Sequence, residues 1–387
     1  MSTNRKTKED KPVLAICYDF DKTLSPDDMQ AQGYIQDVYE GDVGAFWNES
    51  NSMATENEMD NNLAYMYKMV QEAQGRIVFN RKALMDYGAK VALFPGVEGW
   101  FERIRQYGAE KDVIVEHYII SSGLKEMIEG TSVAKAGAFE KIYASSFMYN
   151  DRGVAVWPAQ AINYTNKTQF LFRIEKGVLD INDDGVNDYF SPEKIRVPFR
   201  NIVYIGDSAT DIPCMKLVNV YGGHSIGVYN DTTLDKTKVY KMLQDNRIKY
   251  FAPADYRENS EIDKLVKAII DRTASNEVLE NIHFDCKKEQ EENELKTGTA
   301  KKKRMDLIIS LDDSKNFKTT HTVVESLMTI NKWPEEEIDM LLDIAINNHP
   351  VRFILNDLDV KTFYKKIIKQ LSKPTEKSKK VEAYFKK

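Results

Sequence analysis

CYDFDKTLS, residues 17–25, places two aspartates, Asp19 and Asp21, one residue apart at the point where an apolar run ends. The run, residues 13–16, is short and continuously apolar, which predicts a strand buried on both faces. A tight turn or a helix cap would use one of the two carboxylates. Two carboxylates at this spacing could instead hold a metal ion and attack a phosphate, so a structural and a chemical interpretation are both open.

Similar apolar runs recur along the chain and alternate with longer amphipathic stretches. We expect strands at residues 13–18, 113–120, 141–144, 201–205 and 219–221. Strands separated by helical patterns predict a parallel sheet that is covered by helices on both faces. The expected fold class is therefore α/β, with a Rossmann-like three-layer core.

The segment 25–90 interrupts this alternation directly after the double aspartate. Leu63, Met66, Tyr67 and Val70 recur at helical spacing, and residues 81–87 form a second helical pattern that ends at Gly88. We therefore expect a helical cap at 25–90, inserted into a core that spans 12–24 and 91–275. Within that core, the turn signal at 150–153 predicts a hairpin over residues 147–164.

The character of the chain changes after about residue 275. Residues 276–304 include an almost wholly polar stretch, which predicts a linker or a solvated helix. Two amphipathic patterns then predict a small helical appendage at 305–372, and residues 373–387 form a lysine-rich tail that we expect to be disordered.

The composition excludes several classes of protein. An apolar fraction of 42% and an aromatic fraction of 11% over 387 residues are typical of a folded soluble protein. The net charge of −6 argues against nucleic-acid binding, and no apolar run is long enough for a membrane span. The three cysteines are scattered, and the N-terminus lacks an apolar signal segment, so we expect a cytoplasmic protein.

Four polar pieces follow the expected strands in order. The DFDKT sequence at 19–23 is followed by Ser121-Ser122-Gly123, by Lys167, and by GDSATD at 206–211. Ligands bind outside the carboxyl ends of the strands in parallel α/β sheets, so these pieces are expected to converge. Each piece also has an ordinary interpretation as a turn, a helix cap or a surface lysine, but their joint order favours a site.

This set resembles the haloacid dehalogenase-like superfamily, over residues 12–275. The position of the cap is similar to that in the phosphoserine-phosphatase-like branch. The resemblance implies that Asp19 is the nucleophile and that Asp21 is the general acid and base. It further implies Mg²⁺ as cofactor, held by the Asp19 carboxylate, the Asp21 backbone carbonyl and Asp207.

The same resemblance assigns the supporting residues. Ser121, with Gly123 beside it, would bind a phosphate oxygen, although the sequence leaves a shift to Ser122 open. Lys167 would offset the negative charge of the site, and Asp211 would orient Lys167 or a metal-bound water.

One departure from the family pattern concerns the substrate. By spacing, Asp28 stands where the resemblance implies a substrate-binding glutamate, and no arginine occurs at residues 25–75 to bind a substrate carboxylate. Phe46, Trp47 and Tyr65 are candidate liners of the cap, although packing between cap and core is the commoner role of such aromatics. We therefore expect a Mg²⁺-dependent phosphatase that acts on a phosphomonoester of a small metabolite.

Two alternatives stay open at this point. The chain could dephosphorylate proteins, or it could be a catalytically idle scaffold whose appendage binds a protein partner. Separately, residues 180–188 resemble the first half of a calcium loop, but Ser191 stands where a bidentate carboxylate is required, so a polar turn is favoured.

Overall fold

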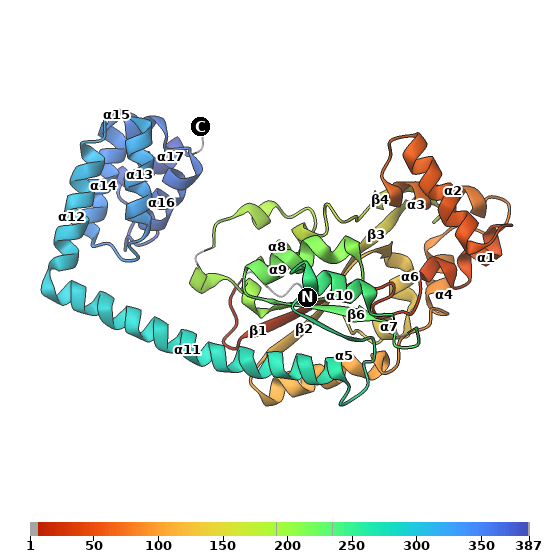
Figure 1. The fold of residues 1–387 in the computed structure, drawn as a ribbon. Coiled ribbons are helices and arrows are strands. Elements are labelled where there is room, and N and C mark those ends of the chain that lie inside the picture. The colour runs from red at the N-terminus through yellow and green to blue at the C-terminus, as the bar shows by residue number, and fades with distance from the viewer. Residues whose placement is uncertain (1–6, 191, 234, 386–387) are drawn as a thin grey trace. The chain divides into compact units, whose positions relative to one another are not determined.

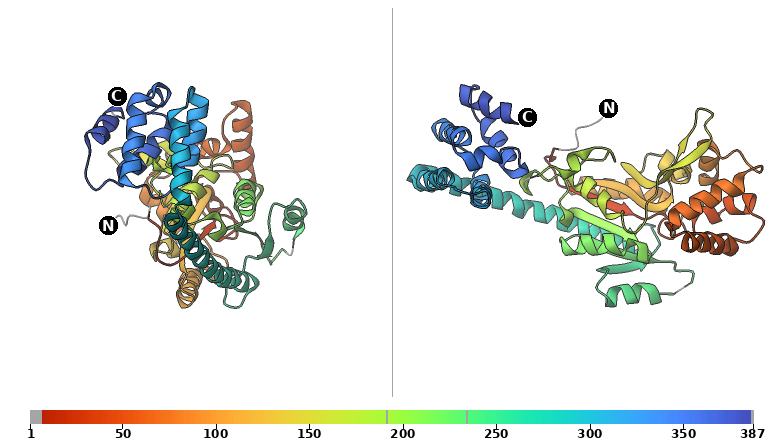
Figure 2. Two further views of the ribbon diagram at one scale, coloured as in Figure 1. Left: turned by 90° about the vertical axis from the view of Figure 1, so that its left-hand side faces the viewer. Right: turned by 90° about the horizontal axis from the view of Figure 1, so that it is seen from above.

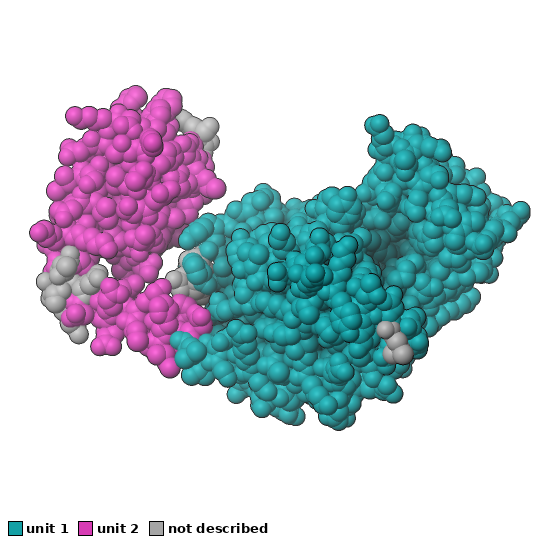
Figure 3. All heavy atoms as spheres, viewed as in Figure 1, with its two compact units in different colours: residues 1–279 teal, residues 280–387 magenta. Residues whose placement is uncertain are grey.

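The computed structural model describes residues 7–190, 192–233 and 235–385. The chain divides into two compact units, Met1–Leu279 and Glu280–Lys387 (Figure 3). Ser191 lies outside the described residues. Each unit is described by itself below.

The first unit is built on one seven-stranded sheet with the strand order β4-β3-β2-β1-β5-β6-β7 (Figure 1). All neighbouring strands pair in parallel except β3 and β4, which pair antiparallel. The strands are β1 (Val13–Tyr18), β2 (Ile114–Leu124), β3 (Lys141–Tyr149), β4 (Ala155–Gln160), β5 (Ile202–Gly206), β6 (His224–Tyr229) and β7 (Tyr250–Pro253). Because β2 and β5 flank β1, their carboxyl ends meet beside that of β1.

Helices cover both faces of this sheet (Figures 1 and 2). Leu14, Ile16 and Tyr18 of β1 belong to the apolar core on one face, which includes residues of α5 (Val97–Glu110) and of the first part of α11 (Glu261–Thr297). The alternate β1 residues belong to the core on the other face, with residues of α8 (Thr168–Lys176), α9 (Ile212–Val220) and α10 (Thr237–Gln244). The predicted three-layer α/β class is therefore confirmed.

Short helices fill the chain between β1 and α5. They are η1 (Met29–Ala31), α1 (Tyr34–Val38), α2 (Val43–Glu56), α3 (Asn61–Ala73) and α4 (Arg81–Gly88). The chain leaves and re-enters the core at one place, because the Phe94 backbone N–H donates to the Leu24 carbonyl at 2.9 Å. We call residues 25–90 the cap; it lies at one end of the sheet in Figures 1 and 2.

Two glycines bring the cap against the core. Helix α4 packs on α6 (Lys125–Gly130), which is followed by α7 (Ser132–Lys135). A Cβ atom at Gly88 would lie 1.9 Å from the Met127 carbonyl oxygen, and one at Gly130 would lie 2.1 Å from that of Met85. The two helices therefore cross at backbone contact, which only glycine permits.

The predicted hairpin is present as β3 and β4, with its turn at Asn150–Gly153. The prediction of a strand at 219–221 is wrong. Those residues end helix α9 and begin the turn before β6, and β7 was not predicted. Residues 219–221 are only three positions long, and periodicity cannot separate the end of a helix from a strand over so short a stretch.

The second unit is helical and has its own core. Its helices are α12 (Thr299–Asp312), α13 (Phe317–Met328), α14 (Glu335–Asn347), α15 (His349–Phe353), α16 (Leu358–Ile368) and α17 (Glu376–Tyr384). Arg304 and Glu337 form a buried ion pair at 2.5 Å inside this unit. The polar stretch at 276–297 is helical, since it belongs to α11.

The tail differs from the prediction. Residues 376–384 form α17, and Val381 has no exposed surface because it packs into the core of the second unit. The lysines of the tail concealed this apolar contact in the sequence. Within the described part of the chain, no helix combines the length and apolarity that crossing a bilayer requires.

Candidate active site

Asp19 lies at the carboxyl end of β1 with only 6% of its surface exposed. Its backbone N–H donates to the Ile205 carbonyl of β5 at 2.9 Å, which extends the β1–β5 pairing by one residue. Its carboxylate accepts two hydrogen bonds, from the Phe20 backbone N–H at 2.8 Å and from the Lys167 ammonium at 3.0 Å. The carboxylate is therefore held in one orientation.

Lys167 is fully buried between two carboxylates. Its ammonium lies 3.0 Å from Asp19 Oδ2 and 2.7 Å from Asp211 Oδ1. Burial alone would lower the pKa of Lys167, but Asp19 and Asp211 raise it above its ordinary value. Lys167 is consequently a fixed positive charge, and the structure places it beside Asp19 and Asp211.

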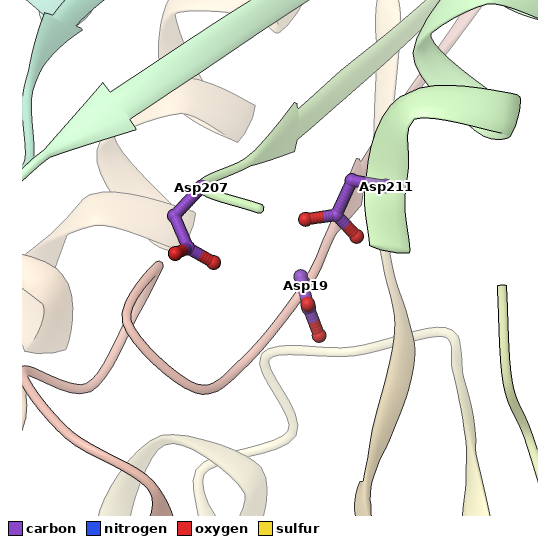
Figure 4. Close-up of side chains that lie close together, drawn as sticks. All are labelled: Asp19, Asp207 and Asp211. Carbon is purple, nitrogen blue, oxygen red and sulfur yellow. The ribbon is translucent and has the colours of Figure 1, made fainter. Parts of the chain in front are cut away.

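Asp207 and Asp211 follow β5 and complete a group of three carboxylates (Figure 4). One oxygen from each of Asp19, Asp207 and Asp211 lies within 4.8 Å of the others. Asp211 is oriented by the Tyr204 hydroxyl at 2.9 Å and by the Ser208 backbone N–H at 3.1 Å. Gly206 leaves room for it, since a Cβ there would lie 2.5 Å from Asp211 Oδ2.

The charges of this group do not balance among the protein's own side chains. Burial, and then the Asp211 carboxylate, raise the pKa of Asp19 to about 7, although Lys167 opposes the shift. Burial and Asp211 also raise the pKa of Asp207, against the pull of Lys238, whose ammonium lies 3.0 Å from Asp207 Oδ2. Lys167 and Lys238 contact the three carboxylates, whereas Lys22, which also lowers the pKa of Asp207, is already paired with Asp28. The group therefore favours an additional cation, and hard oxygen donors suit Mg²⁺. The residues therefore fit the expected metal.

Asp21 lies in the turn beyond Asp19. Its Oδ1 accepts the Met29 backbone N–H at 2.8 Å, and a Cβ at Gly123 would lie 2.9 Å from its Oδ2. Burial, followed by the Asp28 and Asp19 carboxylates, raises the pKa of Asp21 well above its ordinary value. This direction of the pKa shift suits a group that has to hold a proton before it donates it.

The serine pair ends β2 on the other side of Asp19. Ser121 is buried, and its Oγ accepts the Gly123 backbone N–H at 3.1 Å. The backbone carbonyl of Ser122 accepts hydrogen bonds from the Tyr65 and Ser145 hydroxyls, whereas the Ser122 Oγ is buried without a hydrogen-bond partner. Both hydroxyls thus stay candidates for contact with a phosphate.

The family model of haloacid dehalogenase-like hydrolases matches residues 16–216, over half of the chain. The match includes every predicted catalytic and metal-binding residue. The chain belongs to this family.

The individual proteins that are similar to this hydrolase share only a small part of its sequence. An uncharacterized protein of Borreliella burgdorferi is 27% identical over 283 residues, which cover 66% of this chain and 95% of the relative. Among solved structures, a family hydrolase from Salmonella enterica serovar Typhi is 16% identical with a TM-score of 0.44, over 68% of this chain and 73% of its own. A phosphoserine phosphohydrolase-like protein from Francisella tularensis is 18% identical with a TM-score of 0.38, over 62% and 94%.

The three predicted substrate-binding residues have different surroundings in this family member. Asp28 Oδ2 accepts a hydrogen bond from the Lys22 ammonium at 2.7 Å, so the Asp28 carboxylate is already paired with a positive charge. Phe46 has no exposed surface and packs against Tyr39 and Trp47, so the prediction that it lines a substrate site is not supported. Trp47 is partly exposed, and its indole N–H is buried without a hydrogen-bond partner.

Sequence reasoning missed two residues of the site. Lys238 of α10 comes 31 positions after Asp207 and carries no motif, and Tyr204 is one apolar-looking residue of a buried strand. Tyr65 was predicted as a liner of the cap, and the structure places its hydroxyl on the Ser122 carbonyl. Only a folded arrangement could reveal Lys238, Tyr204 and this contact of Tyr65.

Two histidines of this hydrolase lie away from the site. His117 in β2 is fully buried, and the Tyr18 hydroxyl and the Phe101 carbonyl flank its two ring nitrogens, so its role is structural. His224 begins β6, at the opposite end of the sheet from Asp19, and stacks on Tyr250.

The loop 180–188 is held by two cationic side chains. The Arg173 guanidinium donates to the backbone carbonyls of Asp180, Ile181 and Asp183 at 2.6, 2.8 and 3.0 Å. The Lys176 ammonium donates to those of Val186 and Asp188 at 2.6 and 2.8 Å. These carbonyls already have partners, so the loop is built as a polar turn.

Proposed function

We propose that this protein is a Mg²⁺-dependent phosphomonoester hydrolase that acts on a small molecule through an aspartyl-phosphate on Asp19. The observation that carries the proposal is the buried Asp19 carboxylate, held by Lys167 within a group of three aspartates. Family membership supports the hydrolase class. The substrate class and the metal are our inference.

The Asp19 and Asp207 carboxylates, with the Asp21 backbone carbonyl, are the groups that would hold Mg²⁺. When bound, the ion supplies positive charge that neutralises the phosphate and these carboxylates. The two lysines nearest the group, Lys167 and Lys238, supply charge at its edges.

The first chemical step is attack on phosphorus. An Asp19 carboxylate oxygen forms a bond to phosphorus while the bond from phosphorus to the ester oxygen breaks. Asp21 gives its proton to the departing oxygen, for which its raised pKa suits it, since the acid must hold a proton before the step. Asp19 must be ionised to attack, and Lys167 favours that form.

The second step releases inorganic phosphate. The Asp21 carboxylate, now ionised, takes a proton from a water molecule, whose oxygen forms a bond to phosphorus as the bond to Asp19 breaks. Lys167 stays fixed through both steps because Asp211 holds it. Asp211 therefore acts by orienting Lys167.

The substrate is inferred to be small. The cap contacts the core directly beside the site through the Tyr65–Ser122 hydrogen bond at 2.7 Å, and a cap seated there favours a compact phosphate ester over a protein. Every site residue lies between Asp19 and Lys238, in the first unit. We accordingly propose that the second unit binds a protein partner and takes no part in catalysis.

The test is hydrolysis of p-nitrophenyl phosphate by the purified protein, with Mg²⁺ and with excess EDTA. Turnover is expected only with the metal, and Asp19→Asn should lower it by about a thousandfold or more. Asp27→Asn is the matched control, because Asp27 is an exposed carboxylate of the same turn region. An inactive wild-type protein, or full activity in Asp19→Asn, would contradict the proposal.

A further inference from the structure

A chain of hydrogen bonds joins the cap to two catalytic segments of the core. The Tyr65 hydroxyl of α3 donates to the Ser122 carbonyl at 2.7 Å, and the Ser145 hydroxyl of β3 donates to the same carbonyl at 3.1 Å. Ser145 Oγ in turn accepts the Ile162 backbone N–H at 3.0 Å. The Ile162 carbonyl accepts the side-chain amide of Asn62, which returns the chain to α3.

The first turn of α3 is fixed by the same contacts. Asp60 caps this helix, because its Oδ1 accepts the backbone N–H groups of Asn62 and Leu63 at 2.8 and 3.1 Å. Its other oxygen accepts the side-chain amide of Asn163. One end of α3 thus contacts both Ser122 and the loop 161–166.

That loop determines where Lys167 lies. The Asn166 side-chain amide donates to the Ala161 carbonyl at 2.9 Å, while its Oδ1 accepts the Asn163 backbone N–H at 2.9 Å. The Lys167 backbone N–H donates to the Asn163 carbonyl at 3.1 Å. Lys167 directly follows this loop as the N-cap residue of α8, so a displacement of the loop would move the Lys167 ammonium.

The Ser122 carbonyl, like the loop before Lys167, lies next to residues of the site. Ser121 precedes it, and Gly123, whose backbone N–H bonds to Ser121 Oγ, lies against the Asp21 carboxylate. A carbonyl that accepts two hydroxyls fixes the peptide between Ser122 and Gly123. Loss of the Tyr65 donor would leave the Ser145 hydroxyl and the Gly123–Ser121 hydrogen bond to hold that peptide, so its position beside Asp21 would be less tightly fixed.

We propose that Tyr65 and Asn62 are positioning residues of the cap, which set the geometry of Ser121–Gly123 and of Lys167 only while the cap is seated on the core. The inference rests on the proposed phosphatase function. Its consequence is that seating of the cap and assembly of the phosphate-binding groups are one event. A substrate that keeps the cap from seating would bind without being hydrolysed.

The experiment compares two pairs of matched variants in the full-length protein. Tyr65→Phe removes only the hydroxyl that reaches Ser122, and its control is Tyr67→Phe, on an exposed residue of the same helix. Asn62→Ala removes the amide that reaches Ile162, and its control is Asn61→Ala at the exposed preceding position. Values of kcat and KM are measured with p-nitrophenyl phosphate and Mg²⁺, well below each melting temperature.

Each test variant is expected to lose about fivefold or more in kcat, the loss that one hydrogen bond predicts, with KM within about twofold. The controls should match the wild type. A merely structural role would lower the melting temperature and leave kcat intact. Full kcat in both test variants would therefore overturn the proposal.

A second measurement does not depend on activity. Hydrogen exchange, followed by mass spectrometry, should be faster in Asn62→Ala than in Asn61→Ala over residues 161–167, and faster in Tyr65→Phe than in Tyr67→Phe over residues 121–124. If the wild type proves inactive, the proposed phosphatase function fails, and hydrogen exchange alone tests whether Tyr65 and Asn62 position the two core segments. Unchanged exchange at both segments would overturn the positioning proposal.

Discussion

Replacement of Lys167 by methionine tests the electrostatics of the site most sharply. Methionine keeps the length and bulk of the side chain but removes a fully buried charge that contacts Asp19 and Asp211 at 3.0 and 2.7 Å. Removal of one partner from a buried ion pair typically costs about 3–5 kcal/mol, because the remaining charge loses its compensation. Both Asp19 and Asp211 lose their compensating charge here, so we expect Lys167→Met to lower the free energy of unfolding by an amount in the upper part of that range, at pH 8 in EDTA.

The size of this loss should depend on pH in a defined direction. Without Lys167, the pKa values of Asp19 and Asp211 rise, since Lys167 lowers both in the wild type. A carboxyl group with a raised pKa in the folded state costs stability above its unfolded pKa, and the cost is relieved as the folded group takes up a proton. The difference between variant and wild type should therefore be smaller at pH 5.5 than at pH 8.

The assay is equilibrium unfolding in urea, followed by the fluorescence of tryptophans in the first unit, of which Trp100 is fully buried. Lys82→Met is the matched control, because Lys82 and its partner Asp86 are exposed on α4, and we expect no measurable change. Turnover of Lys167→Met with Mg²⁺ should fall by about a hundredfold or more. Equal stability at pH 8, or retained turnover, would refute the assigned role of Lys167.

Three further predictions follow from the packing. Gly88→Ala should lower the free energy of unfolding by about 2–3 kcal/mol, because its Cβ would meet the backbone of Met127. The control Gly99→Ala in α5 has space around its Cβ and should raise the free energy of unfolding by about 0.5–1 kcal/mol. Equal melting temperatures of the two variants would contradict this prediction. Burial lowers the pKa of His117 to about 3, so acidification from pH 7.5 to 5 should cost the wild type about 2 kcal/mol more than His117→Gln in urea unfolding. Val381→Ala should destabilise the second unit by about 2 kcal/mol in calorimetry while phosphatase activity is unchanged, and a loss of activity would argue against a purely non-catalytic second unit.

The sequence predicted the part of the fold that depends on local pattern. The run before Asp19 is continuously apolar because β1 lies in the middle of the sheet and is covered on both faces. The cap was predicted because amphipathic spacing survives in α3 and α4. The strand at 219–221 was mispredicted since a stretch of three residues shows no period. Helix α17 was missed because one buried valine stands among lysines.

The residues of the candidate site likewise divide into those that local pattern predicts and those that only the fold brings together. Asp19, Asp21, Ser121 and Asp207 could be placed together because each was expected at the carboxyl end of one of the parallel strands, and β1, β2 and β5 are neighbours in the sheet. Lys238 could not, since α10 reaches Asp207 only through the fold. The buried state of Phe46 also depends on packing within the cap, which helical spacing alone does not determine.

The covalent intermediate on Asp19 is the central claim, and it can be observed directly. The wild-type protein is mixed with p-nitrophenyl phosphate and Mg²⁺, quenched in acid within the first turnovers, digested with pepsin and analysed by mass spectrometry. We predict that the peptide containing Asp19 gains the mass of one phosphoryl group, that hydroxylamine removes it, and that Asp19→Asn never acquires it. Turnover in the wild type without any phosphoryl group on that peptide, or with the group on another residue, would contradict the account.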